Sequence, residues 1–191
     1  VAEEEEKLKM NLNDEEDETI IITLTGGTNA SPGTQTVHTV TLQDNDNQPS
    51  VYFDLVSQSQ IETAGAITVA YSLNFASGSD IDVNYTVSGT ATNPSDHDLL
   101  SGSFTVIAGA TSGVINLNIQ DDAIFEGQED IDIDITSVVT GLVGNLSSHK
   151  VSIIDNDDPP VVSFATASQT VGEAAGTITL DVTLSKAVAT T

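Results

Sequence analysis

The chain of 191 residues contains no cysteine and no tryptophan. Without cysteine it can form no disulfide, no thiolate metal site and no cysteine nucleophile. Aromatic residues make up only 4% of the sequence, so the rings on which sugars stack in glycosidases and lectins are scarce. Paired carboxylates are therefore not taken as a glycosidase site, and we predict that the chain is not an enzyme.

Positive charge is also scarce, with 4 Lys+Arg against 29 Asp+Glu and a formal net charge of −25. Nucleic acids and anionic membranes bind basic patches, so neither is an expected partner. No apolar run approaches the roughly 18 residues of a membrane span, so direct membrane insertion of this segment is not expected. The hydrophobic residues, 38% of the total, recur periodically and predict a packed core rather than disorder. Divalent cations are the obvious means of neutralising such a folded chain.

The sequence repeats itself. Residues 43–49 (QDNDNQP) return as residues 154–160 (IDNDDPP), at an offset of 155 − 44 = 111. From Glu15 to Phe75, 22 of 61 positions are identical at this offset without a gap. Ordinary residue frequencies would give roughly 5–8% identity by chance. Self-similarity of this kind indicates a tandem array.

The repeat also predicts the domain boundaries. Residues 1–48 are expected to be the C-terminal part of a preceding repeat, residues 49–158 a complete domain, and residues 159–191 the N-terminal strands of a following repeat. We therefore expect the chain to be a piece of a longer protein. Residues 1–10 match nothing in the second copy, and no structure is predicted for them.

Alternation of apolar and polar residues with a period of two predicts β-strands almost throughout. In the central unit we expect seven strands, at about residues 51–56, 66–74, 81–88, 102–107, 112–120, 129–138 and 147–155. Valine, isoleucine and threonine dominate them, and glycine, proline, asparagine and serine separate them. Seven short strands in one unit predict an all-β, immunoglobulin-like Greek-key sandwich, repeated in tandem.

In three of these strands, every second residue is apolar, and the next residue in the same alternation is a carboxylate. The fifth strand leads to Asp121, the sixth begins with Glu129, and the seventh ends with Asp155. Because side chains alternate between the two faces of a strand, these carboxylates are expected to point inward. The opposite face of the sixth strand is expected to meet water, with Asp130, Asp132 and Asp134.

If consecutive strands are antiparallel, these three strand ends lie at one tip of the sandwich, together with the first–second and third–fourth loops. The acidic residues of these segments are Glu62, Asp96, Asp121, Asp122, Glu126, Glu129, Asp155 and Asp157. Like charges this dense repel one another, the more so when they are partly buried. Hard oxygen ligands without histidine or cysteine are what calcium prefers. A solvated acidic loop is the ordinary alternative, but it fits this inward-pointing set poorly.

The motifs of this tip resemble those of the Calx-beta family, the calcium-binding sandwich known from sodium/calcium exchangers. They are residues 89–91 (GTA) leading to Asp96, residues 119–129 (IQDDAIFEGQE) and residues 155–158 (DNDD). The resemblance implies Ca²⁺ as the bound ion and the eight acidic residues of the tip as its ligands. In the partial repeats it implies the equivalent residues Glu18, Asp44, Asp46 and Glu173.

The sequence departs from the exchanger domains at Ala123 and Asn156, where those domains carry acids. Fewer carboxylates imply fewer ions or weaker binding. We expect about two to four ions and an affinity in the extracellular range of about 10⁻⁴–10⁻³ M.

Bacterial members of the family occur in tandem in long secreted surface proteins, including adhesins. The resemblance thus implies a secreted or cell-surface protein. The seventh strand ends at the acidic tip, and the chain then passes through Pro159 and Pro160 into the next repeat. We therefore expect calcium to stiffen this short connection within an extended stalk, with adjacent repeats of the same chain as partners. Surface glycans or proteins could be bound through other domains. Two alternatives stay open, namely a calcium-sensing regulatory module of a membrane protein, and a module that is itself adhesive in surface attachment or motility.

Overall fold

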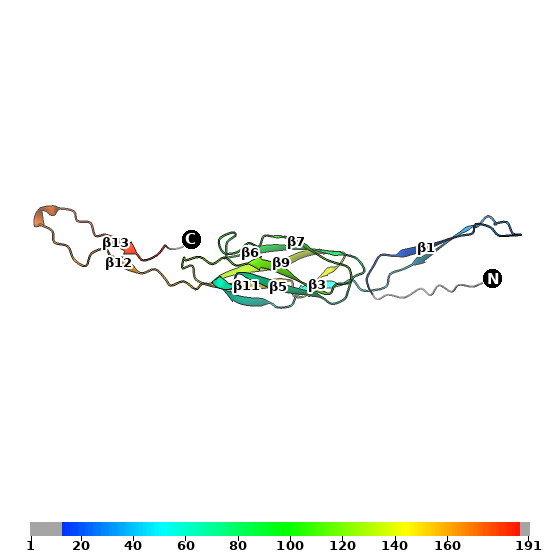
Figure 1. Ribbon diagram of the computed structural model, residues 1–191, viewed down its shortest axis with the longest axis horizontal. Coiled ribbons are helices and arrows are strands. Elements are labelled where there is room, and N and C mark those ends of the chain that lie inside the picture. The colour runs from blue at the N-terminus through cyan, green and yellow to red at the C-terminus, as the bar shows by residue number, and fades with distance from the viewer. Residues whose placement is uncertain (1–12, 188–191) are drawn as a thin grey trace.

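The computed structural model of the chain describes residues 13–187. It is elongated, with a central β-sandwich and a two-stranded hairpin beyond each end (Figure 1). Within residues 13–187 the only helices are two single 3-10 turns, η1 Glu62–Ala64 and η2 Glu173–Ala175. No helix in that range is long and apolar enough to cross a membrane. The acidic segment at residues 1–10 lies outside the described residues.

The sandwich consists of a four-stranded and a five-stranded sheet. The first has the order β10-β3-β5-β8 and contains β10 Leu142–Val143, β3 Ser50–Phe53, β5 Ala66–Leu73 and β8 Ser112–Asn118. The second has the order β4-β11-β9-β6-β7 and contains β4 Ser57–Ile61, β11 Ser148–Ile154, β9 Glu129–Val139, β6 Ile81–Gly89 and β7 Gly102–Val106. The predicted all-β, immunoglobulin-like sandwich is confirmed.

The first predicted strand, at residues 51–56, is wrong in extent. The chain forms β3 in the four-stranded sheet, crosses over at residues 54–56, and forms β4 at the edge of the five-stranded sheet. There β4 pairs in parallel with β11, and the amide of Lys150 donates to the carbonyl of Val56 at 3.0 Å. The sequence of β4 (SQSQI) is mostly polar and therefore predicted a loop. In the structure the strand is only half-buried, along one face. The two-residue strand β10 was not predicted either.

The core lies between the two sheets and contains the predicted apolar stripes. Every apolar residue that defined them is buried: Ile115, Leu117, Ile119, Ile131, Ile133, Ile135, Val151 and Ile153. Full burial of such a side chain stabilises the fold by roughly 1.5–3 kcal/mol. On the outer face of β9, Asp130 and Asp132 pair with the ammonium of Lys150 at 3.0 and 2.9 Å. The parity argument therefore assigned the two faces of these strands correctly.

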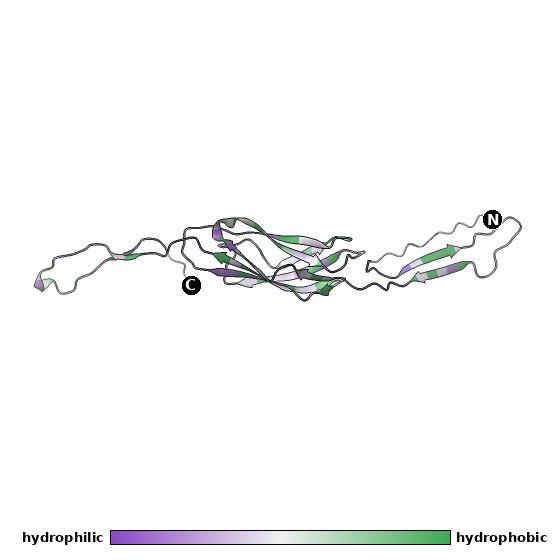
Figure 2. Ribbon diagram, turned by 90° about the horizontal axis from the view of Figure 1, so that it is seen from below, coloured by the Kyte–Doolittle hydropathy of each residue, from purple (hydrophilic) through white to green (hydrophobic). Residues whose placement is uncertain are grey.

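The two hairpins carry apolar residues as well, as Figure 2 shows for the first of them. One pairs β1 Glu18–Thr23 with β2 Val37–Leu42, and the other pairs β12 Val162–Phe164 with β13 Val182–Leu184. Phe53 is fully buried in the sandwich, whereas its repeat equivalent Phe164 is 66% exposed. The hairpins thus have the strand pattern of a sandwich without its second layer, and the assignment of residues 1–48 and 159–191 to partial repeats stays a prediction.

A glycine at the end of β6 brings two strands unusually close. Gly89 has a φ of +128°, and a Cβ at this position would lie 2.1 Å from the carbonyl oxygen of Asp130. The close approach lets the amides of Thr90 and Ala91 donate to that same oxygen at 2.9 and 3.1 Å. The start of the β6–β7 connection is thereby fixed against the start of β9.

We expect Gly89→Ala to lower the free energy of unfolding by about 2–4 kcal/mol. A positive φ costs a residue with a Cβ roughly 1–2 kcal/mol, and an overpacked contact adds typically 1–3 kcal/mol. Urea unfolding without calcium measures the change. Gly109→Ala is the control, because Gly109 also has a positive φ but its Cβ would meet no atom within 4 Å. If Gly89→Ala and Gly109→Ala lowered the free energy of unfolding equally, the close contact between position 89 and Asp130 would be contradicted.

Candidate metal centre

Five segments of the chain meet at the end of the sandwich nearest the hairpin β12–β13 (Figure 1). They are η1, the β6–β7 connection, the β8–β9 connection, the first residue of β9 and the residues that follow β11. Backbone hydrogen bonds join some of them directly. The amide of Ile119 donates to the carbonyl of Gly65 at 2.9 Å, and the amide of Gln120 donates to that of Asp96 at 2.9 Å. The tip is therefore a defined structure and not a set of free loops.

Asp96 and Glu62 are the two most deeply buried acids of the tip, each 6% exposed. A carboxylate oxygen of Asp96 accepts hydrogen bonds from the amide of Thr92 and, at 3.0 Å, from its hydroxyl. Glu62 opens η1, and its Oε1 accepts from the amide of Asp122 at 3.3 Å. The second oxygen of Glu62, Oε2, is buried and has no hydrogen-bond partner. A buried anionic oxygen without a partner is costly unless a cation binds it.

Asp155 organises the opposite side of the tip through backbone contacts. Its Oδ2 accepts from the amides of Glu126 and Gly127, both at 2.8 Å, and its Oδ1 accepts from the amide of Asp157 at 2.7 Å. The carboxylate of Asp157 contacts the ammonium of Lys186 at 3.1 Å through Oδ1, while its Oδ2 is buried and unpartnered. Asp157 and Glu62 thus each direct one unsatisfied oxygen into the same tip.

The carboxylates form three overlapping groups of three residues. Within each group, one carboxylate oxygen from each residue lies within 4.8 Å of the other two. The groups are Glu62 with Asp155 and Asp157, Glu62 with Asp122 and Glu126, and Asp96 with Glu126 and Glu129. Because Glu62 and Glu126 each belong to two groups, the acids form one continuous row across the tip. Of the eight predicted ligands, the structure brings these seven together.

Asp121 is the exception. Its side chain is exposed and it belongs to none of the three groups. The prediction that it points inward is wrong, because β8 ends at Asn118 and the strand alternation does not continue to Asp121. Its charge nevertheless contributes to the field around Glu62, so it lies at the rim of the tip.

Burial and mutual repulsion raise the pKa values of the three glutamates. Burial and then the adjacent Asp96, which also shares a hydrogen bond with it, raise the pKa of Glu129 to about 7. Burial raises the pKa of Glu126 and of Glu62, and the surrounding aspartates raise both further. Burial also opposes ionisation of Asp155, but the amides of Gly127, Asp157 and Glu126 outweigh it and lower its pKa. Without a cation, Glu129 is therefore only partly ionised near neutral pH.

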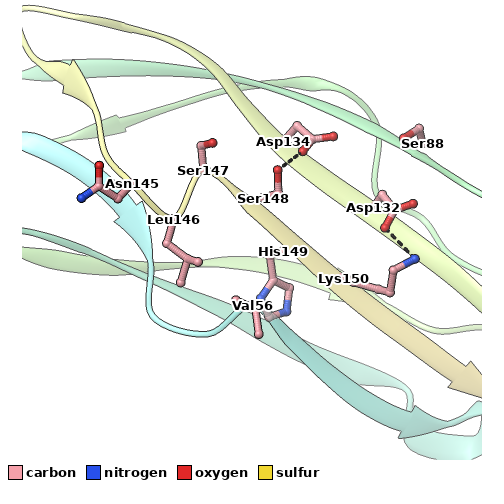
Figure 3. Close-up of a pocket in the computed structure, with 10 residues that line it drawn as sticks. All are labelled: Val56, Ser88, Asp132, Asp134, Asn145, Leu146, Ser147, Ser148, His149 and Lys150. Carbon is pink, nitrogen blue, oxygen red and sulfur yellow. Dashed lines mark hydrogen bonds and ion pairs between the residues drawn. The ribbon is translucent and has the colours of Figure 1, made fainter.

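Acids on the sheet face belong to none of the three groups, and lysine or hydroxyl side chains bind them. A groove of about 500 Å³ runs beside β9 and β11, and Figure 3 shows Asp132 pointing to Lys150 and Asp134 to Ser148. Asp130 has a lowered pKa, because the Ser152 hydroxyl and the Lys150 ammonium bind its carboxylate. These acids are ordinary surface charges, which are paired with neighbouring side chains or solvated.

Of the four acidic residues predicted as ligands in the partial repeats, only Asp44 and Asp46 contact each other. Asp44 and Asp46 follow β2, and the amide of Asp46 donates to Oδ1 of Asp44 at 3.3 Å, as Asp157 does to Asp155. Glu18 opens β1 and Glu173 opens η2, and both are exposed. Burial and then Asp44 and Asp46 raise the pKa of Asp14, which sequence reasoning did not select. No group of three potential ligands forms in the described parts of these two segments.

Two contacts of the tip were missed from the sequence. Thr92 binds Asp96 from only four residues away, and a threonine preceding an acidic loop is too common to be a signal. Lys186 lies 29 residues after Asp157 in a different hairpin, and only the placement of that hairpin relative to the tip brings the two charges together.

Comparison with known proteins agrees with this geometry. The Calx-beta domain family matches residues 44–157 and again residues 155–191. The chain belongs to the Calx-beta domain family. None of the curated proteins compared with the chain matches it.

Solved structures of Calx domains share the fold. The apo form of the Calx CBD1 domain has a TM-score of 0.53 and 21% identity, and the match covers 58% of this chain and 100% of that domain. The calcium binding domain CBD12 of CALX1.1 has a TM-score of 0.53 and 21% identity, with 61% of this chain and 48% of that one covered. The Calx CBD2 domain has a TM-score of 0.51 and 14% identity, with 56% and 86% covered. The chain thus spans about half the length of CBD12.

The donor set fits the ion that Calx-beta domains bind. Every side chain in the three groups is a carboxylate, which matches the preference of Ca²⁺ for several hard oxygen ligands. The buried, unpartnered oxygens of Glu62 and Asp157 are the positions at which a cation would supply the missing partner. Bound there, calcium would contribute charge neutralisation and cross-links between segments, while the backbone amides around Asp155 already orient that carboxylate.

The raised pKa values predict that the calcium-free domain is less stable at pH 8 than at pH 5. Glu129 has a folded-state pKa of about 7 against a model value of 4.5, so the folded state binds more protons than the unfolded state between these values, and stability falls as the pH rises through them. Allowing for screening, Glu129 accounts for on the order of 1–2 kcal/mol. The lowered pKa values of Asp130 and Asp155 affect stability only at lower pH.

Urea unfolding in EDTA between pH 5 and pH 8 measures this slope, and Glu129→Gln should reduce it. Asp132→Asn is the matched control, because it removes one acid from the sheet face and should leave the slope in place. A calcium-free domain that is more stable at pH 8 than at pH 5 would contradict the assigned electrostatics.

Proposed function

We propose that this chain is a calcium-binding structural repeat that stiffens an extended, secreted or cell-surface protein. The observation that carries the proposal is the position of the acidic tip at the junction between the sandwich and the next hairpin. The chain leaves β11, passes Asp155 and Asp157, and enters β12 through Pro159 and Pro160. The short, proline-restricted connection therefore contains two of the seven candidate metal ligands.

Calcium at this tip would act as a cross-link. The row of carboxylates comes from five segments. Ions bound along it would connect η1, the β6–β7 and β8–β9 connections, the start of β9 and the residues that follow β11. Without calcium the same carboxylates repel one another, and part of the repulsion is relieved only by protonation. An array of such units would be stiff in calcium-rich surroundings and looser in their absence. Adjacent repeats are the immediate partners in this proposal.

Direct adhesion is the second candidate, and the groove beside β9 and β11 is the observation that favours it. Its lining offers hydroxyl, amide, carboxylate and ammonium groups (Figure 3). It contains no tyrosine, phenylalanine or tryptophan, so it lacks the stacking surface of a typical sugar site. Binding of an immobilised glycan or protein ligand that is lost in Asp134→Asn but not in Glu62→Gln would support this second function.

The stiffening function predicts that calcium raises the melting temperature and narrows the range of molecular dimensions. At a hundred times the dissociation constant, one bound ion stabilises the folded state by roughly 2.7 kcal/mol. Thermal melting and small-angle X-ray scattering with calcium and with EDTA measure the two effects. Glu62→Gln should abolish most of the calcium-induced shift, whereas Asp132→Asn, which removes the same charge from the sheet face, should preserve it.

Identical melting temperatures and scattering profiles with calcium and with EDTA would contradict the proposal. Calorimetric titration separates it from a sensor. A stiffening repeat is expected to bind at about 10⁻⁴–10⁻³ M, whereas affinity in the range of about 10⁻⁷–10⁻⁵ M would favour calcium sensing.

A further inference from the structure

A lysine that follows β13 contacts one end of the carboxylate row. The Lys186 ammonium lies 3.1 Å from Oδ1 of Asp157, and the two side chains are 39% and 15% exposed. Lys150 is the other lysine of residues 13–187, and it pairs with aspartates on the sheet face instead. The sequence contains no arginine. Among the described residues, Lys186 is therefore the lysine with which the chain itself neutralises part of the tip.

The base of the hairpin β12–β13 holds this lysine beside the tip. The amide of Ser185 donates to the carbonyl of Val161 at 3.0 Å, and the amide of Val161 donates to Oγ of Ser185 at 2.8 Å. Val161 follows Asp157 by only four residues, and two prolines lie between them. The contact of Lys186 with Asp157 thus closes a ring that consists of the connection and the base of the hairpin.

Asp157 forms one of the three groups with Glu62 and Asp155, and most oxygens of this group already have a partner. Both oxygens of Asp155 accept backbone amides. Oε1 of Glu62 accepts the amide of Asp122, and Lys186 binds Oδ1 of Asp157. Oε2 of Glu62 and Oδ2 of Asp157 are the oxygens of this group that are left without a partner. Lys186 has therefore taken one of the three oxygens that the backbone leaves free.

Lys186 also acts on this group through its charge. Its ammonium binds Asp157 directly, and its field reaches Asp155 as well. The affinity of a site for Ca²⁺ depends on how many charged ligands it contains, and two cations at short distance repel one another. The lysine thus supplies part of the neutralisation that a calcium ion would otherwise supply at this end of the row.

We propose that Lys186 is a tethered cation that lowers the calcium affinity of the group formed by Glu62, Asp155 and Asp157. It neutralises Asp157 and keeps one of its oxygens from the ion. Because Lys186 belongs to the segment that follows β13, the calcium affinity of the sandwich depends on the hairpin that comes after it. The inference rests on the proposed function, since it assumes that calcium binds at the tip, and it adds what sets the strength of that binding.

Calorimetric titration of the whole chain with calcium chloride at low salt tests the proposal. We expect Lys186→Met to raise the calcium affinity roughly three- to tenfold, because it removes a unit charge a few ångströms from a divalent ion. Lys186→Arg keeps the charge and should keep the affinity of the unsubstituted chain. Lys150→Met is the matched control, because it removes the same charge from the sheet face and should leave the affinity unchanged.

Two further measurements show whether the effect passes through Asp157. In a chain that already carries Asp157→Asn, Lys186→Met should change the calcium affinity much less, because the two residues interact directly. Added salt should reduce the difference between the unsubstituted chain and Lys186→Met, because it screens a partly exposed ion pair. In EDTA, the NMR resonance of the Lys186 ammonium, assigned by its loss in Lys186→Met, should shift in Asp157→Asn.

An unchanged calcium affinity in Lys186→Met would overturn the proposal. A lower affinity would overturn it as well, since Lys186 would then orient Asp157 for the ion rather than compete with it. An equal gain in Lys150→Met would do the same, because the effect would be one of net charge. Position 186 lies outside the central sandwich, so an unaltered melting transition in EDTA verifies that Lys186→Met still folds.

Failure of the stiffening function has a different signature. In that case calcium binds and its affinity responds to Lys186→Met, but the scattering profile of the unsubstituted chain is the same with calcium and with EDTA. A chain that binds calcium and stiffens, but whose affinity does not respond to Lys186→Met, would overturn only the role of the lysine. Absence of calcium binding in every variant would overturn both proposals.

Discussion

Electrostatic repulsion among the carboxylates at one end of the sandwich is the constraint on which the rest of the structure depends. Seven acids form a continuous row within short distance of one another, and two of their oxygens are buried without any partner. Such a row closes only if protons or cations neutralise it. The protein contains few basic residues, so the positive charge has to come largely from outside the chain.

The scaffold holds this row in place by ordinary β-sandwich packing. The apolar stripes of β8, β9 and β11 end at the tip, so the core fixes the strand ends from which the acids extend. Gly89 brings the β6–β7 connection against β9, and the amides around Asp155 orient its carboxylate before any ion arrives. The residues that follow β11 carry two of these acids and lead into the hairpin β12–β13. Any change in charge at the tip therefore acts on the connection between the sandwich and that hairpin.

The alternation of residues in the sequence was enough to predict the sandwich, its inner faces and the end at which the acids gather. It failed where the chain departs from regular strands. The polar segment that forms β4 gives no apolar signal, because it is an edge strand that pairs through its backbone with β11. Asp121 lies beyond the last residue of β8, where strand parity no longer fixes the direction of a side chain. The contact of Lys186 with Asp157 depends on how two units are joined, which no pattern within one unit can reveal.

The central claim is that metal ions occupy the carboxylate row, and an anomalous difference map from crystals grown with calcium tests it most directly. The account predicts anomalous peaks beside the unpartnered oxygens of Glu62 and Asp157 and between Asp96, Glu126 and Glu129. Peaks confined to the paired acids of the sheet face, or a tip filled only by ordered water at saturating calcium, would contradict it.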